Sequence, residues 1–201
     1  MKTTIALLLV AFAGIQAQIG IPCHSNIFNF TPRHNLNISR YAGTWYVQEV
    51  GSSNIGNFPQ PDWKCEKHVY SAPTETDPPT LSVLEVYVNI TDGTTFSEDM
   101  PISVNATRSP MSAMWRKTSG VDGDLESQVF IMSADLEFAT WTIMYSCAIH
   151  KPFFFRREVL MAMTRSRTIQ PDLRSFLKAL MVGGGFRIGD QWSIDQTGCT
   201  N

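Results

Sequence analysis

The sequence predicts an all-β fold, an eight-stranded antiparallel up-and-down β-barrel with one C-terminal α-helix packed outside it. Three observations lead to this prediction. Strand-like runs recur at short and even intervals, turn signals such as Asp92-Gly93 and Asp122-Gly123 separate them, and a single amphipathic segment follows late in the chain. No internal repeat or interdomain linker divides the sequence, so we expect one domain.

The first residues are typical of an export signal. A basic start at Met1-Lys2 precedes an almost wholly apolar run from Ile5 to Ile15, and Ala17 offers a small residue for cleavage. The apolar run is shorter than the roughly 20 residues that a membrane anchor needs. We therefore interpret residues 1–17 as a signal peptide and residues 18–201 as the mature domain, and we predict a secreted, extracellular protein without a membrane span.

The strands are expected at β-rich runs that end at glycine or proline turns. They are predicted at Thr44 to Val50, Lys64 to Ser71, Leu81 to Ile90, Thr94 to Thr107 (interrupted near Pro101), Met111 to Lys117, Leu125 to Ser133, Thr140 to Ile149 and Phe154 to Thr164. The helix is expected to begin at Pro171-Asp172 and to end at the triple glycine 183–185. Its apolar face consists of residues at helical spacing, namely Leu173, Phe176, Leu177 and Leu180.

Four cysteines in an exported chain predict two disulfides, and the sequence leaves all three pairings open. They are Cys23, Cys65, Cys147 and Cys199. Four Asn-x-Ser/Thr triplets predict a glycoprotein, beginning at Asn29, Asn37, Asn89 and Asn105. The formal net charge of −2 gives no basic field for nucleic acid.

Catalytic and metal sites find little support in the sequence. No pair of histidines has metal-binding spacing, so no metal site is predicted. No Gly-x-Ser-x-Gly motif is present, and paired cysteines would leave no thiolate nucleophile. Glu126 and Asp135 are scattered acids, more consistent with solvated side chains than with a catalytic pair. We therefore predict no enzyme and no required cofactor.

Three motifs together resemble the lipocalin family over nearly all of the mature chain. Gly43-Thr44-Trp45-Tyr46 matches the first lipocalin motif, after a short turn from Leu36 to Tyr41. Residues 143–147 look like the strand that ends the second motif, and Arg165 falls where the third places its arginine. The cysteine positions point to the subgroup of apolipoprotein D, insect bilin-binding proteins and crustacyanins. This resemblance implies the pairs Cys23 with Cys147 and Cys65 with Cys199.

The chain departs from two of these motifs. The second usually contains Thr-Asp-x-x-x-Tyr, which we align with residues 136–141, so that Glu137 replaces the aspartate and Trp141 the tyrosine. The third often contains a tryptophan that lines the barrel, where this chain has Met161-Ala162-Met163. Ligand preference therefore does not transfer directly from the family.

The resemblance implies a barrel closed at one end, with Trp45 as its floor and Arg165 over the indole face. Gly43, Trp45 and Arg165 are accordingly structural residues. Inward strand residues would meet the ligand, although a register slip of one residue would reverse any assignment. The candidates are Val47, Glu49, Val69, Tyr87, Trp115, Phe130, Trp141 and Met161.

The predicted function is carriage of a small hydrophobic ligand (a lipid, steroid, retinoid, carotenoid or bilin). One alternative is a chromophore-binding subunit of a coloured assembly, with homo- or hetero-oligomers formed through outward aromatics such as Phe153-Phe154-Phe155. A secreted isomerase is a further alternative, because a few lipocalins use a free cavity cysteine for this chemistry. Capture of an anionic metal chelate is the weakest alternative.

Overall fold

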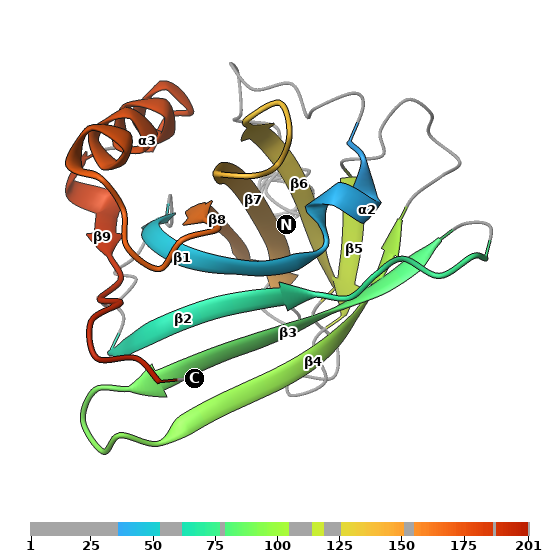
Figure 1. The fold of residues 1–201 in the computed structure, drawn as a ribbon, viewed down its shortest axis with the longest axis horizontal. Helices are drawn as coiled ribbons and strands as arrows, with labels where there is room; N and C mark the ends of the chain where they lie inside the picture. Colours follow the sequence, from blue (N-terminus) through green and yellow to red (C-terminus); the bar gives the residue numbers. More distant parts are fainter. Residues whose placement is uncertain are drawn as a thin grey trace, which may run out of the picture.

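The computed structural model describes residues 36–52, 62–76, 79–104, 114–118, 126–150, 155–186 and 188–200. Their strands form one antiparallel sheet in the order β2-β3-β4-β5-β6-β7-β8-β1-β9. β1 also pairs with β2, so the first eight strands close into a barrel. The ribbon curls round accordingly, and the C-terminal helix α3 lies outside it (Figure 1). The predicted barrel with one late helix is confirmed.

Each predicted strand is present within a few residues of its expected bounds. The strands are β1 Gly43–Ser52, β2 Trp63–Tyr70, β3 Thr80–Asn89, β4 Thr95–Val104, β5 Met114–Thr118, β6 Glu126–Ala134, β7 Trp141–His150, β8 Phe155–Thr164 and β9 Gln191–Ser193. The helical elements are α2 Ile38–Tyr41, α3 Pro171–Gly183 and the short 3-10 helix η2 Ile188–Asp190. None of the described helices is long and apolar enough to cross a membrane.

Pro101 does not interrupt β4, which corrects the prediction for this strand. The register between β3 and β4 is unbroken, and Pro101 lies opposite Ser82. Proline removes one backbone donor from a strand, but the pairing on both sides of it continues.

β1 and β2 pair only near the start of β1, and the C-terminal segment joins them beyond that point. Their register runs from Gly43 to Tyr46 on β1, and β9 then takes the same edge of β1. The Gln196 amide donates to the carbonyls of Val47 and Glu66, at 2.8 Å each. These contacts satisfy carbonyls of β1 and β2 that would otherwise have no partner where the two strands separate. β9 was not predicted, because three residues give no periodicity to read.

The disulfide between Cys65 and Cys199 fixes this C-terminal segment to β2. Cys65 lies in an irregularity of the β2–β3 register and has a positive φ of 59°. Its backbone N–H donates to the Asp195 carbonyl at 2.8 Å. The pairing that the resemblance implied is therefore confirmed for these two cysteines. Cys147 is also disulfide-bonded, and its predicted partner Cys23 lies outside the described residues.

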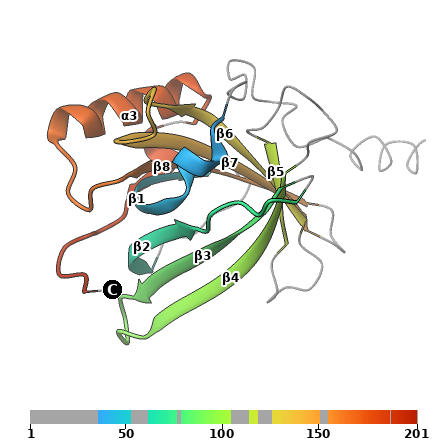
Figure 2. The ribbon, with the colours of Figure 1, turned by 45° about the vertical axis from the view of Figure 1, so that its right-hand side comes forward.

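Two buried clusters occupy the two faces of the sheet. The inner cluster fills one end of the barrel and includes Tyr41, Trp45, Tyr70 and Trp115. The outer cluster lies between the sheet and α3, where Leu177 and Met181 are fully buried. Figure 2 shows α3 lying along the outer side of the barrel, near β7 and β8. Strand residues alternate between these clusters because successive side chains point to opposite faces.

A β-bulge in β1 reverses the predicted orientation of Glu49. The register with β8 shifts between Val47 and Glu49, so the alternation from Trp45 does not continue through the bulge. Val50 joins the inner cluster. Glu49 instead pairs with Arg174 and Lys178 of α3, at 3.3 Å each. The predicted inward side chain is wrong here, and this buried carboxylate anchors the helix.

Three more predicted inward residues lie on the outer face. Phe130 belongs to the cluster under α3, and Trp141 packs against Phe176 of that helix with ring centroids 5.4 Å apart. Val69 lies between His68 and the inward Tyr70, so strand alternation places it outside. We expected large apolar side chains to face the barrel interior. The helix α3, however, creates a second apolar core on the outer face, and such side chains are buried there too.

Candidate functional site

The closed end of the barrel is a floor of packed aromatic rings. Tyr41 contacts Trp45 at 5.2 Å, Tyr70 at 5.1 Å and Trp115 at 5.2 Å between ring centroids. Edge-to-face ring pairs of this kind are favourable beyond their buried area. All four rings are almost fully buried, so the floor excludes solvent from this end.

Arg165 seals the floor from outside. Its guanidinium carbon lies 3.8 Å from the centroid of the Trp45 ring, within cation–π range. The guanidinium also donates to five backbone carbonyls, those of Phe138, Thr44, Arg40, Tyr41 and Ala42, at 2.9–3.0 Å. Burial lowers the pKa of Arg165, an effect that the charges of Tyr41 and Asp135 oppose.

Gly43 is required where the chain enters the barrel under Arg165. Its φ of +100° is a conformation that residues with a side chain rarely adopt. A Cβ there would also lie 3.2 Å from a terminal nitrogen of Arg165. The glycine of the first motif therefore permits both the turn and the arginine contact.

The turn between β6 and β7 is held by Asp135 and not by Glu137. The Asp135 carboxylate accepts hydrogen bonds from the backbone N–H groups of Ala139, Thr140 and Trp141 at 3.0–3.2 Å. Burial by itself would raise the pKa of the Asp135 carboxyl, but these hydrogen bonds lower the pKa by a larger amount, so the net shift is downward. Glu137 is mostly exposed and pairs with Arg40. Our alignment of the second motif, and the interpretation of Asp135 as a solvated acid, are therefore wrong.

Above the floor, the inner wall of β2, β3 and β4 carries both acidic and aromatic side chains. His68 is fully buried, and its Nε2 lies 3.2 Å from Glu66 and 3.6 Å from Glu85. Nearer the hairpin of residues 89–95, Tyr87 stacks on Phe96 with centroids 5.4 Å apart and planes 19° apart. Sequence reasoning identified Tyr87 but missed the acidic group, because its members lie on separate strands.

Four of the predicted ligand residues face the interior. Val47 and Trp115 belong to the floor and are fully buried, and Met161 packs against the same cluster while remaining partly exposed. Tyr87 shares the inner face of β3 with Leu81 and Val83 by alternation. Contact of these residues with a ligand stays a prediction.

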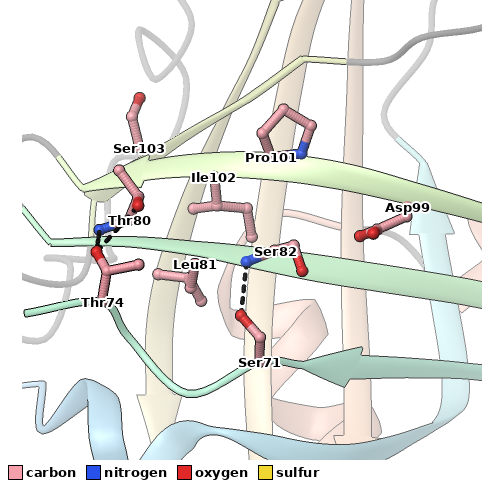
Figure 3. Close-up of a pocket in the computed structure, with 9 residues that line it drawn as sticks. All are labelled: Ser71, Thr74, Thr80, Leu81, Ser82, Asp99, Pro101, Ile102 and Ser103. Carbon is pink, nitrogen blue, oxygen red and sulfur yellow. Dashed lines mark hydrogen bonds between the residues drawn. The ribbon is translucent and has the colours of Figure 1, made fainter.

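A separate groove of about 610 Å³ lies near the closed end, on the β3–β4 ribbon (Figure 3). Its lining is Ser71, Thr74, Thr80, Leu81, Ser82, Asp99, Pro101, Ile102 and Ser103. Most of these residues alternate with inward neighbours such as Val83 and Met100, so they belong to the outer face. Ser71 accepts a hydrogen bond from the Ser82 backbone at 2.8 Å and extends the β2–β3 pairing. The groove opens to solvent on the outer face and is lined mainly by Ser, Thr and Asp residues, unlike an enclosed apolar ligand cavity.

The remaining predicted sites are only partly described. Asn37 is exposed and caps α2 by accepting from the Arg40 backbone at 3.1 Å. Asn89 accepts from the Thr91 backbone at 2.7 Å, in the β3–β4 turn. The signal peptide, Asn29, Asn105 and the side chains of residues 153–155 lie outside the described set. Within the described set, no three His, Cys, Asp or Glu side chains are grouped to hold a metal ion.

No protein-family model matches this chain, and no curated protein matches it in sequence. Solved structures do match it in fold. Apocrustacyanin C2 has a TM-score of 0.59 and 17% identity, with 81% of each chain covered. Apocrustacyanin C1 has a TM-score of 0.57 and 17% identity, covering 79% of this chain and 78% of its own. Lobster apocrustacyanin A1 has a TM-score of 0.55 and 16% identity, covering 87% and 92%.

This chain has the lipocalin fold. The resemblance to the crustacyanin subgroup, first indicated by the motifs around Trp45 and Arg165, is thereby confirmed at the level of the fold. In lipocalin terms, the Tyr41–Trp45–Arg165 floor is the closed end of the barrel. The wall that carries His68 and Tyr87 leads to the opposite end.

Proposed function

We propose that this protein is a secreted carrier that holds a small hydrophobic ligand inside its barrel. The observation that supports this most is the contrast along the barrel axis. One end is filled by buried rings, while Tyr87 and Met161 on the inner wall remain partly exposed. Eight-stranded barrels of this kind have room for one small ligand above their floor. Lipids, steroids, retinoids and conjugated pigments are the proposed classes.

Ligand binding is tested with the neutral fluorescent probe N-phenyl-1-naphthylamine. Apolar burial favours binding by about 25 cal/mol per Å² before the costs of association, so we expect a blue-shifted, saturable emission. Mass spectrometry of an organic extract of the native protein then identifies the natural ligand. Absence of saturable binding, together with an extract free of small molecules, would overturn the proposal.

The second candidate is a chromophore-binding subunit of a coloured assembly. It is favoured by the structural likeness to the apocrustacyanins and by the crustacyanin-like motifs. A visible absorption band in the native protein, eluting with an oligomer on size exclusion, would select it over a lipid carrier. A colourless monomer would exclude it.

An isomerase that relies on a free cysteine is less well supported. The described cysteines Cys65, Cys147 and Cys199 are all disulfide-bonded, and a thiolate nucleophile requires a free thiol. Thiol titration of the denatured, unreduced protein tests this point. One reactive thiol per chain would revive the enzyme alternative.

A further inference from the structure

The inner face of β6 and β7 carries two serines above the floor of the barrel. On β6, Ser127 is two residues from Val129, which belongs to the inner cluster, and no register shift lies between them. Ser127 therefore faces the interior, because strand side chains alternate between the two faces. On β7, Ser146 lies opposite Val129 of β6 and Val159 of β8, which both belong to the inner cluster. Directly opposite residues share a face of the sheet, so Ser146 also points inward.

These inward side chains are small and remain partly exposed, unlike the residues closer to the floor. Val129 and Met144 are only 2% and 3% exposed. Farther from the β6–β7 turn, Ser127 and Ser146 are half-buried, and so is Ala148, which lies opposite Ser127. Because all three side chains point inward, their exposed surface opens into the barrel interior. The packed floor thus ends below them, and their small size leaves interior space free.

Both serine hydroxyls are free to bind a ligand. Within the part of the chain that the structure describes, no residue forms a hydrogen bond with the side chain of Ser127 or Ser146. The two serines are diagonal neighbours, since Ser127 is two residues from the residue opposite Ser146. Diagonal neighbours are about 7–8 Å apart, and their Cβ atoms are somewhat closer. One oxygen atom placed between the two hydroxyls can therefore accept a hydrogen bond from each.

An aromatic ring lies across the barrel from these serines. In the closed order of eight strands, β3 and β7 are four strands apart, so their inner faces lie on opposite sides of the barrel (Figure 1). Tyr87 of β3 is half-buried on this inner face and stacks on Phe96. Aromatic faces pack well against flat apolar groups. The interior thus offers a ring face on one side and small side chains with two hydroxyls on the other.

We propose that Ser127 and Ser146 bind the carbonyl oxygen of an uncharged apolar ligand, whose body packs between Tyr87 and Ala148. This inference rests on the proposed function, because it names the ligand class for the same barrel. A carbonyl oxygen has two lone pairs and can accept from both hydroxyls. A hydrocarbon would leave both hydroxyls without a partner, and a carboxylate would bring a charge into a site where these two groups are neutral. The serine pair therefore selects an apolar ketone or ester.

Three naphthalenes of nearly the same shape test this class. 2-Acetylnaphthalene is the ketone, 2-isopropenylnaphthalene has a CH2 group in place of the oxygen, and 2-naphthoate is an anion at pH 7. Their affinities are measured by displacement of N-phenyl-1-naphthylamine. We expect the ketone to bind about fivefold more tightly than the alkene, as one net hydrogen bond provides, and the anion to bind most weakly. Equal affinity for ketone and alkene, or tightest binding of the anion, would refute the proposal.

Matched variants separate the hydroxyls from the space around them. The double variant Ser127→Ala, Ser146→Ala should lose the preference for the ketone and keep its affinity for the alkene, because alanine leaves the space open. Ser97→Ala, at an exposed position on the outer face of β4, should change neither affinity.

Infrared spectroscopy of bound 2-acetylnaphthalene gives a second measurement that a purely structural role of the serines would not affect. Hydrogen bonds to the carbonyl oxygen lower its stretching frequency, so the frequency should be lower in the unmutated protein than in the double variant. A ketone preference and a carbonyl frequency that both survive the double substitution would rule out the serine site.

The same probes distinguish failure of this inference from failure of the proposed function. If N-phenyl-1-naphthylamine binds and the ketone and the alkene displace it equally well, the carrier stands and the serine site falls. If neither N-phenyl-1-naphthylamine nor any of the naphthalenes binds saturably, apolar carriage falls and the serine site falls with it.

Discussion

The two ends of the inner barrel surface differ in how completely their aromatic rings are buried. At the floor, the rings of Tyr41, Trp45 and Trp115 pack with almost no exposure, and every Arg165 nitrogen donates to a carbonyl. On the wall above it, Tyr87 is partly exposed and Phe96 is 44% exposed. The floor is thus packed for stability, whereas the wall leaves ring surface uncovered.

The largest expected effect comes from removing the ring at the centre of the floor. Trp45→Ala deletes a fully buried indole and its contact with Arg165, and we expect a loss of about 3–5 kcal/mol in unfolding free energy. Phe96→Ala removes a ring from the inner wall above the floor. It should cost less than about 1 kcal/mol, because Phe96 already contacts solvent.

Urea denaturation of both variants measures this contrast. Equal losses in the two variants would show that the wall contributes to stability as much as the floor does, and the comparison would fail.

A smaller effect is expected for Arg165→Lys. Lysine keeps the positive charge but cannot span the carbonyls of Phe138, Thr44 and Ala42 with a planar fork. Leaving buried carbonyls unsatisfied costs about 1–3 kcal/mol, so we expect a loss in that range by thermal or urea unfolding. An unchanged midpoint would mean that charge alone, and not the five donated hydrogen bonds, holds the floor closed.

The turn carboxylate at the floor predicts a pH dependence. Because the folded-state pKa of Asp135 is lowered from its ordinary value of 3.8, its stabilisation is present above pH 3.8. It is lost as pH falls through the lower folded pKa. Asp135→Asn should cost about 1 kcal/mol at pH 7 and reduce the fall in stability on acidification. Glu137→Asn, at a mostly exposed position, is the control. If the stability of the Asp135 variant falls with pH as that of the unmutated protein does, Asp135 does not hold the turn in this way.

The sequence predicted the fold well because local signals and global pairing agree along most of the chain. The Asp92-Gly93 turn signal falls between β3 and β4, and the helix begins at Pro171 and ends at Gly183. It was harder to predict whether a given strand side chain faces the barrel interior or the outer face. The bulge after Val47 and the covering of Phe130 by α3 each depend on contacts distant in sequence, which alternation alone does not encode.

The acidic wall was missed for a related reason. Glu66, His68 and Glu85 belong to two strands, and only the β2–β3 register brings them together. Glu66 also follows the irregularity at Cys65, so its inward position does not follow from simple alternation. A histidine and a glutamate two residues apart on one strand were the available signal, because side chains at that spacing share a face.

The smallest expected change in stability tests whether space remains above the floor. Met161 is partly exposed on the inner wall, where the related subgroup often has tryptophan. Met161→Trp should alter unfolding free energy by less than about 1 kcal/mol if the larger ring extends into open space. The same ring should weaken N-phenyl-1-naphthylamine binding, because it occupies volume that the probe needs. Met163→Trp is the matched control at a fully buried floor position, where overpacking should cost about 1–3 kcal/mol. If Met161→Trp destabilises the protein as strongly as Met163→Trp, the packed floor extends up to this wall and leaves no room for a ligand beside Met161.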